Sequence, residues 1–213
     1  MTLRARQQEE KQERRDSILN AAEQVFFVKG YDRATMDDIA RGARLSRGLV
    51  YVYFRDKQDI LASIVLRALE SLRQRFRDTD RAELCGADRL EAMGRNYLAF
   101  SAEEPNYFDV LTRAAGDWLQ VDSLTDRDAL LCCSGEVMEI MARALSDGLA
   151  DGSVDPARVR DPAETALYLR GALHGVIMLT RNFAEHPEEL SHVAPDSLLE
   201  YTIRSLIESI RRR

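Results

Sequence analysis

The side chains best suited to contacting a polyanion lie in one short segment of the 213-residue sequence. Arg47 stands in the first turn of an expected short helix, from which a guanidinium can reach guanine edges or phosphate oxygens. Gly48 beside it lets a backbone approach closely, because glycine has no side chain. Tyr51 and Tyr53 offer hydroxyl groups to phosphates, and Lys57 adds a positive charge at the start of the following helix. This combination predicts an interaction with double-stranded DNA.

Residues that could support catalysis or bind a metal lack a recognisable arrangement. Asp128, Cys132, Ser134 and His174 could be imagined as nucleophile and base, but the sequence holds no nucleophile elbow, phosphate-binding loop or metal motif. The three histidines and three cysteines do not have metal-ligand spacing, so we expect neither a metal nor another cofactor. A redox role for Cys132 and Cys133 stays open, although no cationic residue adjoins them in the sequence. The sequence therefore argues against an enzyme.

The elements that must position the DNA-contacting residues are short helices with clear start signals. Apolar residues recur at helical spacing within residues 5–29, and Gly30 ends that first helix. Thr35 can cap a second helix, whose two aspartates suit its positive end, and Ser46 can cap a third. A long fourth helix follows Asp56. Two short helices joined by a tight turn describe a helix-turn-helix, although such a pair also occurs as ordinary core packing.

Together these helices resemble the N-terminal signature of the TetR family of regulators. The resemblance covers about residues 12–65, and its residues are Ile18-Leu19, Ala21-Ala22, Phe26, Gly30, Thr35-Met36-Asp37-Asp38-Ile39-Ala40, Ser46-Arg47-Gly48, Tyr51-Val52-Tyr53-Phe54 and Lys57. The resemblance implies an all-helical dimer with a divergent C-terminal domain that binds a small molecule, which usually relieves repression. It also implies a DNA-facing surface that contains Thr35, Ser46, Arg47, Gly48, Leu49, Tyr51 and Tyr53, with Lys57 holding a phosphate.

Two residues depart from the family pattern. Arg44 stands in the expected turn where the family commonly has glycine, so either the turn accommodates a Cβ atom or Arg44 carries modest strain. Leu49 replaces a frequent threonine, which removes one hydroxyl contact but could pack on a thymine methyl group. Neither departure undermines the resemblance, but with both present the operator sequence does not follow from the family pattern. The arginines before Arg15 alternate with glutamates, so they could hold flanking DNA backbone or simply face solvent.

The remainder of the chain is also expected to be helical, which gives an all-α protein with a three-helix head at residues 1–56 and a ligand-binding and dimerisation domain at residues 57–213. Helical periods run over residues 88–103, 105–119, 124–150, 162–185 and 195–213. The helix at 162–185 is apolar nearly all round, so it must be buried on more than one side. We expect it to form a four-helix dimer bundle with the last helix, as in the family, while two core helices of a monomer are the alternative. The expected interface residues are Leu169, Gly171, Ala172, Gly175, Val176, Leu199, Ile203 and Leu206.

A small-molecule pocket is expected among aromatic and methionine residues of the second domain, because such side chains can shape an apolar cavity with a few polar handles. The candidates are Tyr97, Phe100, Tyr107, Phe108, Trp118, Met138, Met141 and His174. At helical spacing the same residues could be plain core, and His174 could be a hydrogen-bonded core or interface histidine. An apolar or aromatic effector would suit this set.

The charge distribution fits two separate tasks. The formal net charge is −6, yet residues 1–60 contain 12 Lys/Arg and 10 Asp/Glu, so long-range attraction to DNA would come from this segment alone. The sequence shows no signal peptide, and its most apolar window, residues 166–179, is shorter than the about 20 residues that span a bilayer. We therefore expect a cytoplasmic, ligand-responsive repressor whose partners are operator DNA, a small-molecule effector and a second copy of itself, with no membrane partner. A helical interaction protein that does not bind DNA is the alternative.

Overall fold

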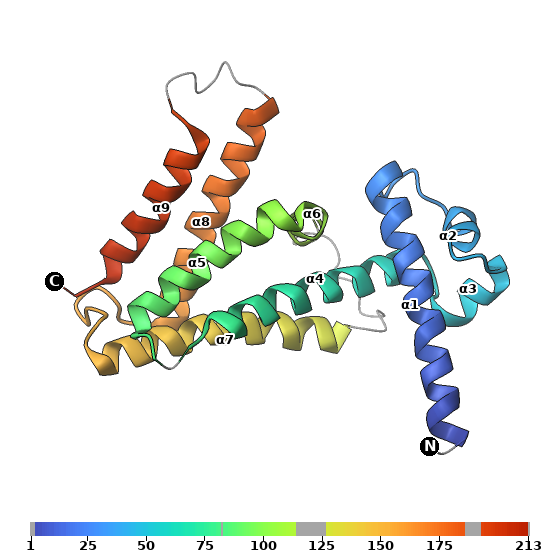
Figure 1. The fold of residues 1–213 in the computed structure, drawn as a ribbon, viewed down its shortest axis with the longest axis horizontal. Coiled ribbons are helices and arrows are strands. Elements are labelled where there is room, and N and C mark those ends of the chain that lie inside the picture. The colour runs from blue at the N-terminus through green and yellow to red at the C-terminus, as the bar shows by residue number, and fades with distance from the viewer. Residues whose placement is uncertain (1–2, 82, 114–126, 186–192, 213) are drawn as a thin grey trace. The chain divides into compact units, whose positions relative to one another are not determined.

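A computed structural model describes residues 3–81, 83–113, 127–185 and 193–212 of the chain, and these residues form an all-helical structure, as predicted (Figure 1). The helices are α1 (Leu3–Lys29), α2 (Met36–Gly42), α3 (Arg47–Tyr53), α4 (Lys57–Thr79), α5 (Gly86–Glu103), α6 (Pro105–Arg113), α7 (Arg127–Asp151), α8 (Pro162–Glu185) and α9 (Pro195–Ile210). The sequence predicts that α6 extends to residue 119 and that α7 begins at residue 124. Both of these helix ends lie outside the described residues. None of the described helices is both long enough and apolar enough to cross a membrane.

The two shortest helices begin at the capping residues that the sequence predicts. The hydroxyl oxygen of Thr35 accepts a hydrogen bond from the backbone N–H of Asp38 at 3.1 Å, and the Asp38 carboxylate accepts one from the backbone N–H of Thr35 at 3.2 Å. This capping box satisfies two N–H groups that a helix start otherwise leaves unpaired. Ser46 caps α3 by accepting a hydrogen bond from the N–H of Leu49 at 3.2 Å.

The turn between α2 and α3 contains the strained residue that the sequence raised as one possibility. Arg44 has a φ of 58°, and it is the one non-glycine residue with a positive φ in the described part of the chain. For a residue with a Cβ atom this left-handed conformation costs roughly 1–2 kcal/mol. The turn is still closed by a hydrogen bond from the N–H of Leu45 to the carbonyl of Ala40 at 2.9 Å. The tight turn of the helix-turn-helix is therefore kept at the expense of strain at Arg44.

The chain divides into two compact units, and the boundary within α4 falls after Ala68. The first unit, which we call the head, contains residues 1–68 with 109–130, and the second, which we call the body, contains residues 69–108 with 131–213. The core of the head is built from Ile18, Leu19, Ala22, Phe26, Ile39, Val50, Phe54, Ile60 and Ile64, all of them buried. At its edge Arg67 on α4 bonds two carboxylates of α1, Asp16 at 2.7 Å and Glu23 at 3.0 Å. These two ion pairs join α4 to α1 within the head.

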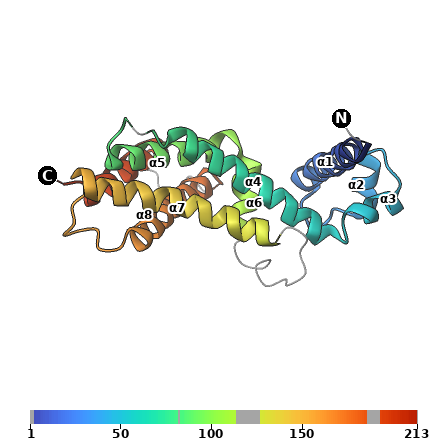
Figure 2. The same ribbon diagram turned by 90° about the horizontal axis from the view of Figure 1, so that it is seen from below.

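The body is a bundle of helices around an apolar core. α8 and α9 lie side by side as an antiparallel pair, and α5 packs against both (Figure 1). The body part of α4 runs along α7, where Arg73 bonds Glu136 at 2.9 Å (Figure 2). The start of α5 approaches α7 so closely that a Cβ atom at Gly86 would collide with the backbone of Ala144 and Gly148. The glycine therefore allows the close approach of α5 to α7.

Candidate DNA-binding surface and effector cavity

α3 presents an exposed face of basic, aromatic and small residues. Arg47, Gly48, Tyr51 and Val52 are exposed, whereas Val50 is fully buried in the core of the head. A Cβ atom at Gly48 would meet no atom within 4 Å, so packing inside the chain does not require glycine at this position. The bare backbone at Gly48 instead leaves room for a partner to approach α3 closely.

The guanidinium of Arg47 is placed by two neighbours on the head surface. Its Nη1 lies 3.3 Å from the Asp37 carboxylate, its Nη2 lies 3.4 Å from the Tyr51 hydroxyl oxygen, and the group lies 5.5 Å from the centroid of the Tyr51 ring. The hydrogen bond to Tyr51 and the charge of Asp37 raise the pKa of Arg47, so its charge is permanent. Because an exposed ion pair contributes little stability, a phosphate or a guanine edge can replace Asp37 at low cost.

Lys57 is engaged by the backbone of the chain itself. Its ammonium donates hydrogen bonds to the carbonyl oxygens of Tyr31 at 2.6 Å, Asp32 at 3.3 Å and Ala34 at 3.1 Å, and it lies 4.3 Å from the centroid of the Tyr31 ring. An ammonium has three N–H donors, so these carbonyls occupy all of them. The expectation that Lys57 holds a phosphate stays a prediction. In the structure Lys57 fixes the segment that leads into Thr35 and α2.

The other DNA-facing candidates either cap helices or point partly inward. Thr35 and Ser46 are exposed, and their hydroxyl groups are engaged at the starts of α2 and α3. Leu49 and Tyr53 are half-buried. The structure therefore brings Arg47, Gly48 and Tyr51 together on one open face, while Leu49 and Tyr53 are less accessible.

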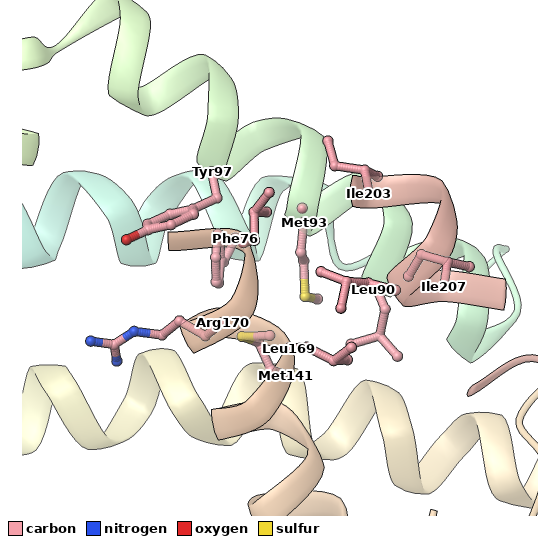
Figure 3. A pocket seen from close by; sticks show the side chains of 12 residues that line it. Phe76, Leu90, Met93, Tyr97, Met141, Leu169, Arg170, Ile203 and Ile207 are labelled. Carbon is pink, nitrogen blue, oxygen red and sulfur yellow. The ribbon is translucent and has the colours of Figure 1, made fainter. Parts of the chain in front are cut away.

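The body contains an apolar cavity between its helices (Figure 3). Side chains of α4, α5, α7, α8 and α9 line it, and most of them are aliphatic, aromatic or methionine, among them Phe76, Leu90, Met93, Met141, Leu169 and Ile203. Its free volume is about 40 Å³, which is well below the roughly 300 Å³ of a small ligand pocket. A ligand that enters this cavity must therefore widen it.

Polar groups gather at one side of the cavity. The hydroxyl of Tyr97 lies 2.8 Å from Nδ1 of His174. Burial raises the pKa of Tyr97 to about 12, so the phenol stays protonated and can donate this hydrogen bond. Burial and, second, the charge of Arg170 lower the pKa of His174, so its imidazole is neutral at pH 7 and Nδ1 can accept. The ring of Phe108 covers the pair, with its centroid 5.7 Å from that of Tyr97 and 5.4 Å from that of His174.

Comparison with known families decides what kind of protein carries these two sites. Residues 18–64 match the family model "Bacterial regulatory proteins, tetR family", and residues 90–206, more than half of the chain, match "Tetracyclin repressor-like, C-terminal domain". The chain belongs to the TetR family. It is a DNA-binding transcriptional regulator of this family, and the family assignment rules against an enzyme built on Asp128, Cys132, Ser134 and His174.

Individual transcriptional regulators match different lengths of the chain. The transcriptional repressor BepR of Brucella suis biovar 1 is 48% identical over 56 residues, which are 26% of this chain and 27% of BepR, so the match spans about a quarter of that relative. The transcriptional regulator TtgR of Pseudomonas putida is 27% identical over 164 residues, 72% of this chain and 76% of TtgR. The crystal structure of FadR from Bacillus subtilis in complex with stearoyl-CoA has a TM-score of 0.67 at 18% identity, covering 91% of this chain and 98% of FadR. At this identity the likeness to FadR shows a shared fold.

In this TetR-family regulator several of the expected ligand-binding residues lie together, although not all of them line the cavity. Rings of Tyr97, Phe100, Phe108 and His174 form one cluster, with Phe100 and Phe108 centroids 6.4 Å apart. Of the candidates, Tyr97 and Met141 line the cavity. Met138 contacts Arg170, Tyr107 is half-buried, and Trp118 lies outside the described residues. The sequence analysis did not predict that aliphatic residues and Arg170 line the cavity. Apolar residues recur at helical spacing on several faces, and their spacing does not indicate which face borders a cavity.

The expected dimer residues of the regulator fall into three groups by burial. Leu169, Leu199 and Ile203 are buried within the subunit, and Leu169, Ile203 and Leu206 line the cavity. Gly171 and Gly175 are exposed on the opposite face of α8, while Ala172, Val176 and Leu206 are half-buried. Sequence periodicity marked both faces of α8 as apolar but could not tell which of them faces inward.

Proposed function

We propose that this regulator binds a near-palindromic operator as a homodimer, represses transcription there, and leaves the DNA when a small molecule binds its body. Residues 1–56 carry the DNA-binding function, and residues 57–213 carry effector binding and dimerisation. Such a regulator works in the cytoplasm, where its operator is found. The proposed DNA-facing residues are Arg47, Gly48, Leu49, Tyr51 and Tyr53 of α3, with Thr35 and Ser46 at the helix starts.

The single observation that carries the DNA proposal is the open backbone of Gly48 next to the charged and hydroxyl groups of α3. A major groove admits an α-helix whose first turn contacts base edges, and Arg47 occupies that turn. Tyr51, one turn further along, carries its hydroxyl on the same exposed face. We assign Lys57 a positioning role in this proposal, because its ammonium orders the segment before α2 rather than pointing to a partner.

The proposed dimer interface is the exposed apolar face of α8, with the neighbouring part of α9. The side chains of Leu167, Tyr168 and Leu179 are 61%, 58% and 51% exposed. A group of exposed apolar side chains on one helix face is typical of a protein–protein interface. Gly171 and Gly175 lie among them at helical spacing, and a Cβ atom at either would meet nothing within 4 Å. This face therefore offers a partner helix both apolar area and a close approach. A two-fold dimer then matches two half-sites of one operator.

Effector binding and DNA binding are coupled in this proposal through α4, which belongs to both units. A ligand that stabilises a conformation with the two heads wrongly spaced must lower DNA affinity, and DNA must lower ligand affinity by the same factor. Relief of repression by the ligand follows from this reciprocity. The cavity of the body is the place where we propose that the ligand binds.

Fluorescence anisotropy with labelled genomic fragments, selected for binding to the wild-type protein, tests the DNA proposal. We expect Arg47→Ala to weaken binding by about 1–3 kcal/mol, a loss of roughly five- to 150-fold. Arg143→Ala, which removes an exposed arginine of α7 and changes the net charge equally, is the matched control and should leave affinity unchanged. Equal affinities of wild type and Arg47→Ala would remove α3 from the DNA interface.

A further inference from the structure

The cavity of the body has a charged edge that the proposed function does not explain. Among the described residues Arg170 is the one charged member of the lining, and the rest of the lining is apolar apart from the hydroxyl of Tyr97. In Figure 3 the guanidinium of Arg170 and the hydroxyl of Tyr97 point to the same side of the cavity, away from the aliphatic side chains. The cavity is thus apolar at one end and cationic at the other.

No acidic side chain in the described part of the chain forms an ion pair with Arg170. Its Nη1 contacts the sulfur of Met138, at 3.3 Å, and a thioether is a weak acceptor. Several other arginines of the body differ, because Arg73, Arg75, Arg89 and Arg95 each lie 2.6–2.9 Å from a carboxylate oxygen. The charge of Arg170 also acts to lower the pKa of both Tyr97 and His174. Arg170, which is exposed, therefore brings to the edge of the cavity a positive charge that no described carboxylate pairs with.

The apolar part of the cavity suits a slender, flexible ligand. A free volume of about 40 Å³ is well below the roughly 300 Å³ of a small ligand pocket, so an occupant has to move side chains aside. Met93 and Met141 lie in the lining, and unbranched methionine side chains adapt more readily than branched or aromatic ones. An alkyl chain requires less displacement of this lining than a fused ring system does.

We propose that the effector is an anionic amphiphile, with an alkyl or acyl chain in the cavity and a carboxylate or other anionic head group bound by Arg170 beside the Tyr97 hydroxyl. The identity of this ligand as the effector rests on the function proposed above. A guanidinium can bind a carboxylate through two parallel hydrogen bonds, which fixes the orientation of the head group. Because the chain must widen the cavity, the ligand favours one conformation of the body over another, as any effector must.

Isothermal titration calorimetry on the full chain with dodecanoate and with dodecyltrimethylammonium tests this proposal, since the two carry the same alkyl chain and opposite charges. We expect wild type to bind dodecanoate at least about tenfold more tightly than the cation, and dodecanoate to weaken binding to the selected genomic fragments. Arg170→Gln should lose most of the preference for the anion. Arg143→Gln, an exposed arginine of α7 outside the lining, is the matched control and should keep it.

Three results would overturn the proposal: equal affinity for the two amphiphiles, an unchanged preference in Arg170→Gln, or no binding of dodecanoate up to about 1 mM. Dodecanoate that binds with the expected preference but leaves DNA affinity unchanged would overturn its role as effector. DNA binding by the same preparation separates this proposal from the proposed function. DNA binding without a preference for the anionic amphiphile would contradict only the proposed ligand class. A preference for the anion without DNA binding would contradict only the proposed function as a DNA-binding regulator.

Discussion

Arg44 is the residue whose side chain conflicts most directly with its backbone conformation. Its φ of 58° costs roughly 1–2 kcal/mol for a residue with a Cβ atom, whereas glycine adopts this conformation freely but loses about 0.5–1 kcal/mol more entropy on folding. We therefore expect Arg44→Gly to raise the free energy of unfolding by about 0.5–1 kcal/mol, measured by urea denaturation.

Arg44→Ala is the control for this prediction, because alanine removes the guanidinium but keeps the Cβ atom that causes the strain. We expect its stability to stay close to that of wild type. A gain in Arg44→Ala as large as that in Arg44→Gly would show that the side chain, and not the backbone, is responsible.

Single residues could be predicted from the sequence where their partners are local. Thr35 and Ser46 bond N–H groups three residues ahead, so their roles follow from spacing alone. The partners of Lys57 lie more than twenty positions away in sequence, and the sequence could not show that they occupy its donors. The strain at Arg44 could be anticipated, because its place in the turn was visible without any tertiary contact.

The start of α2 links a helix cap to the pH dependence of stability. Hydrogen bonds from Lys29, at 2.7 Å, and from Thr35 lower the pKa of Asp38 from 3.8 to about 2. A carboxyl group with a lower pKa in the folded state stabilises the protein above its unfolded pKa, and this contribution is lost as the pH falls through the folded pKa. We expect the advantage of wild type over Asp38→Asn in thermal midpoint to be full above about pH 4 and to shrink steadily toward pH 2.

Asp37→Asn is the matched control for the α2 cap, since Asp37 lies in the same helical turn but takes no part in the capping box. Because the capping box stays in place in Asp37→Asn, this variant should keep the loss of stability that wild type shows as the pH falls toward 2. An advantage over Asp38→Asn that stays constant across this range would mean that the capping box does not depend on the charge of Asp38.

Helices as elements were largely predictable, while their inward faces were not. The proline, glycine and capping signals are local, and they placed the helices from α1 to α9 close to where they are observed. α8 shows what local signals omit, because apolar residues surround it and either side could be the core. Only the packing of α5 and α9 against α8 decides that Leu169 and Leu173 face the cavity, leaving Leu167 and Tyr168 exposed.

Assembly of two subunits is the property that connects the exposed face of α8 to operator binding. Gly175 is exposed on that face, and a Cβ atom there would meet nothing within 4 Å, so a leucine would project toward a partner helix and hold it away. We therefore expect Gly175→Leu to shift the protein from dimer to monomer at micromolar concentration in sedimentation equilibrium, and to weaken operator binding because half-sites are then bound singly.

Gly135→Leu provides a closely matched control for Gly175→Leu. Gly135 is an exposed helical glycine of α7, and a Cβ atom there would likewise meet nothing within 4 Å, so leucine at this site adds the same apolar area and the same change in helix propensity. It should leave both the dimer and the operator affinity intact. A wild-type monomer at micromolar concentration, or a dimer in Gly175→Leu, would place the subunit interface somewhere other than α8. Loss of the dimer in both variants would mean that added surface leucine, and not its position on α8, disturbs the assembly.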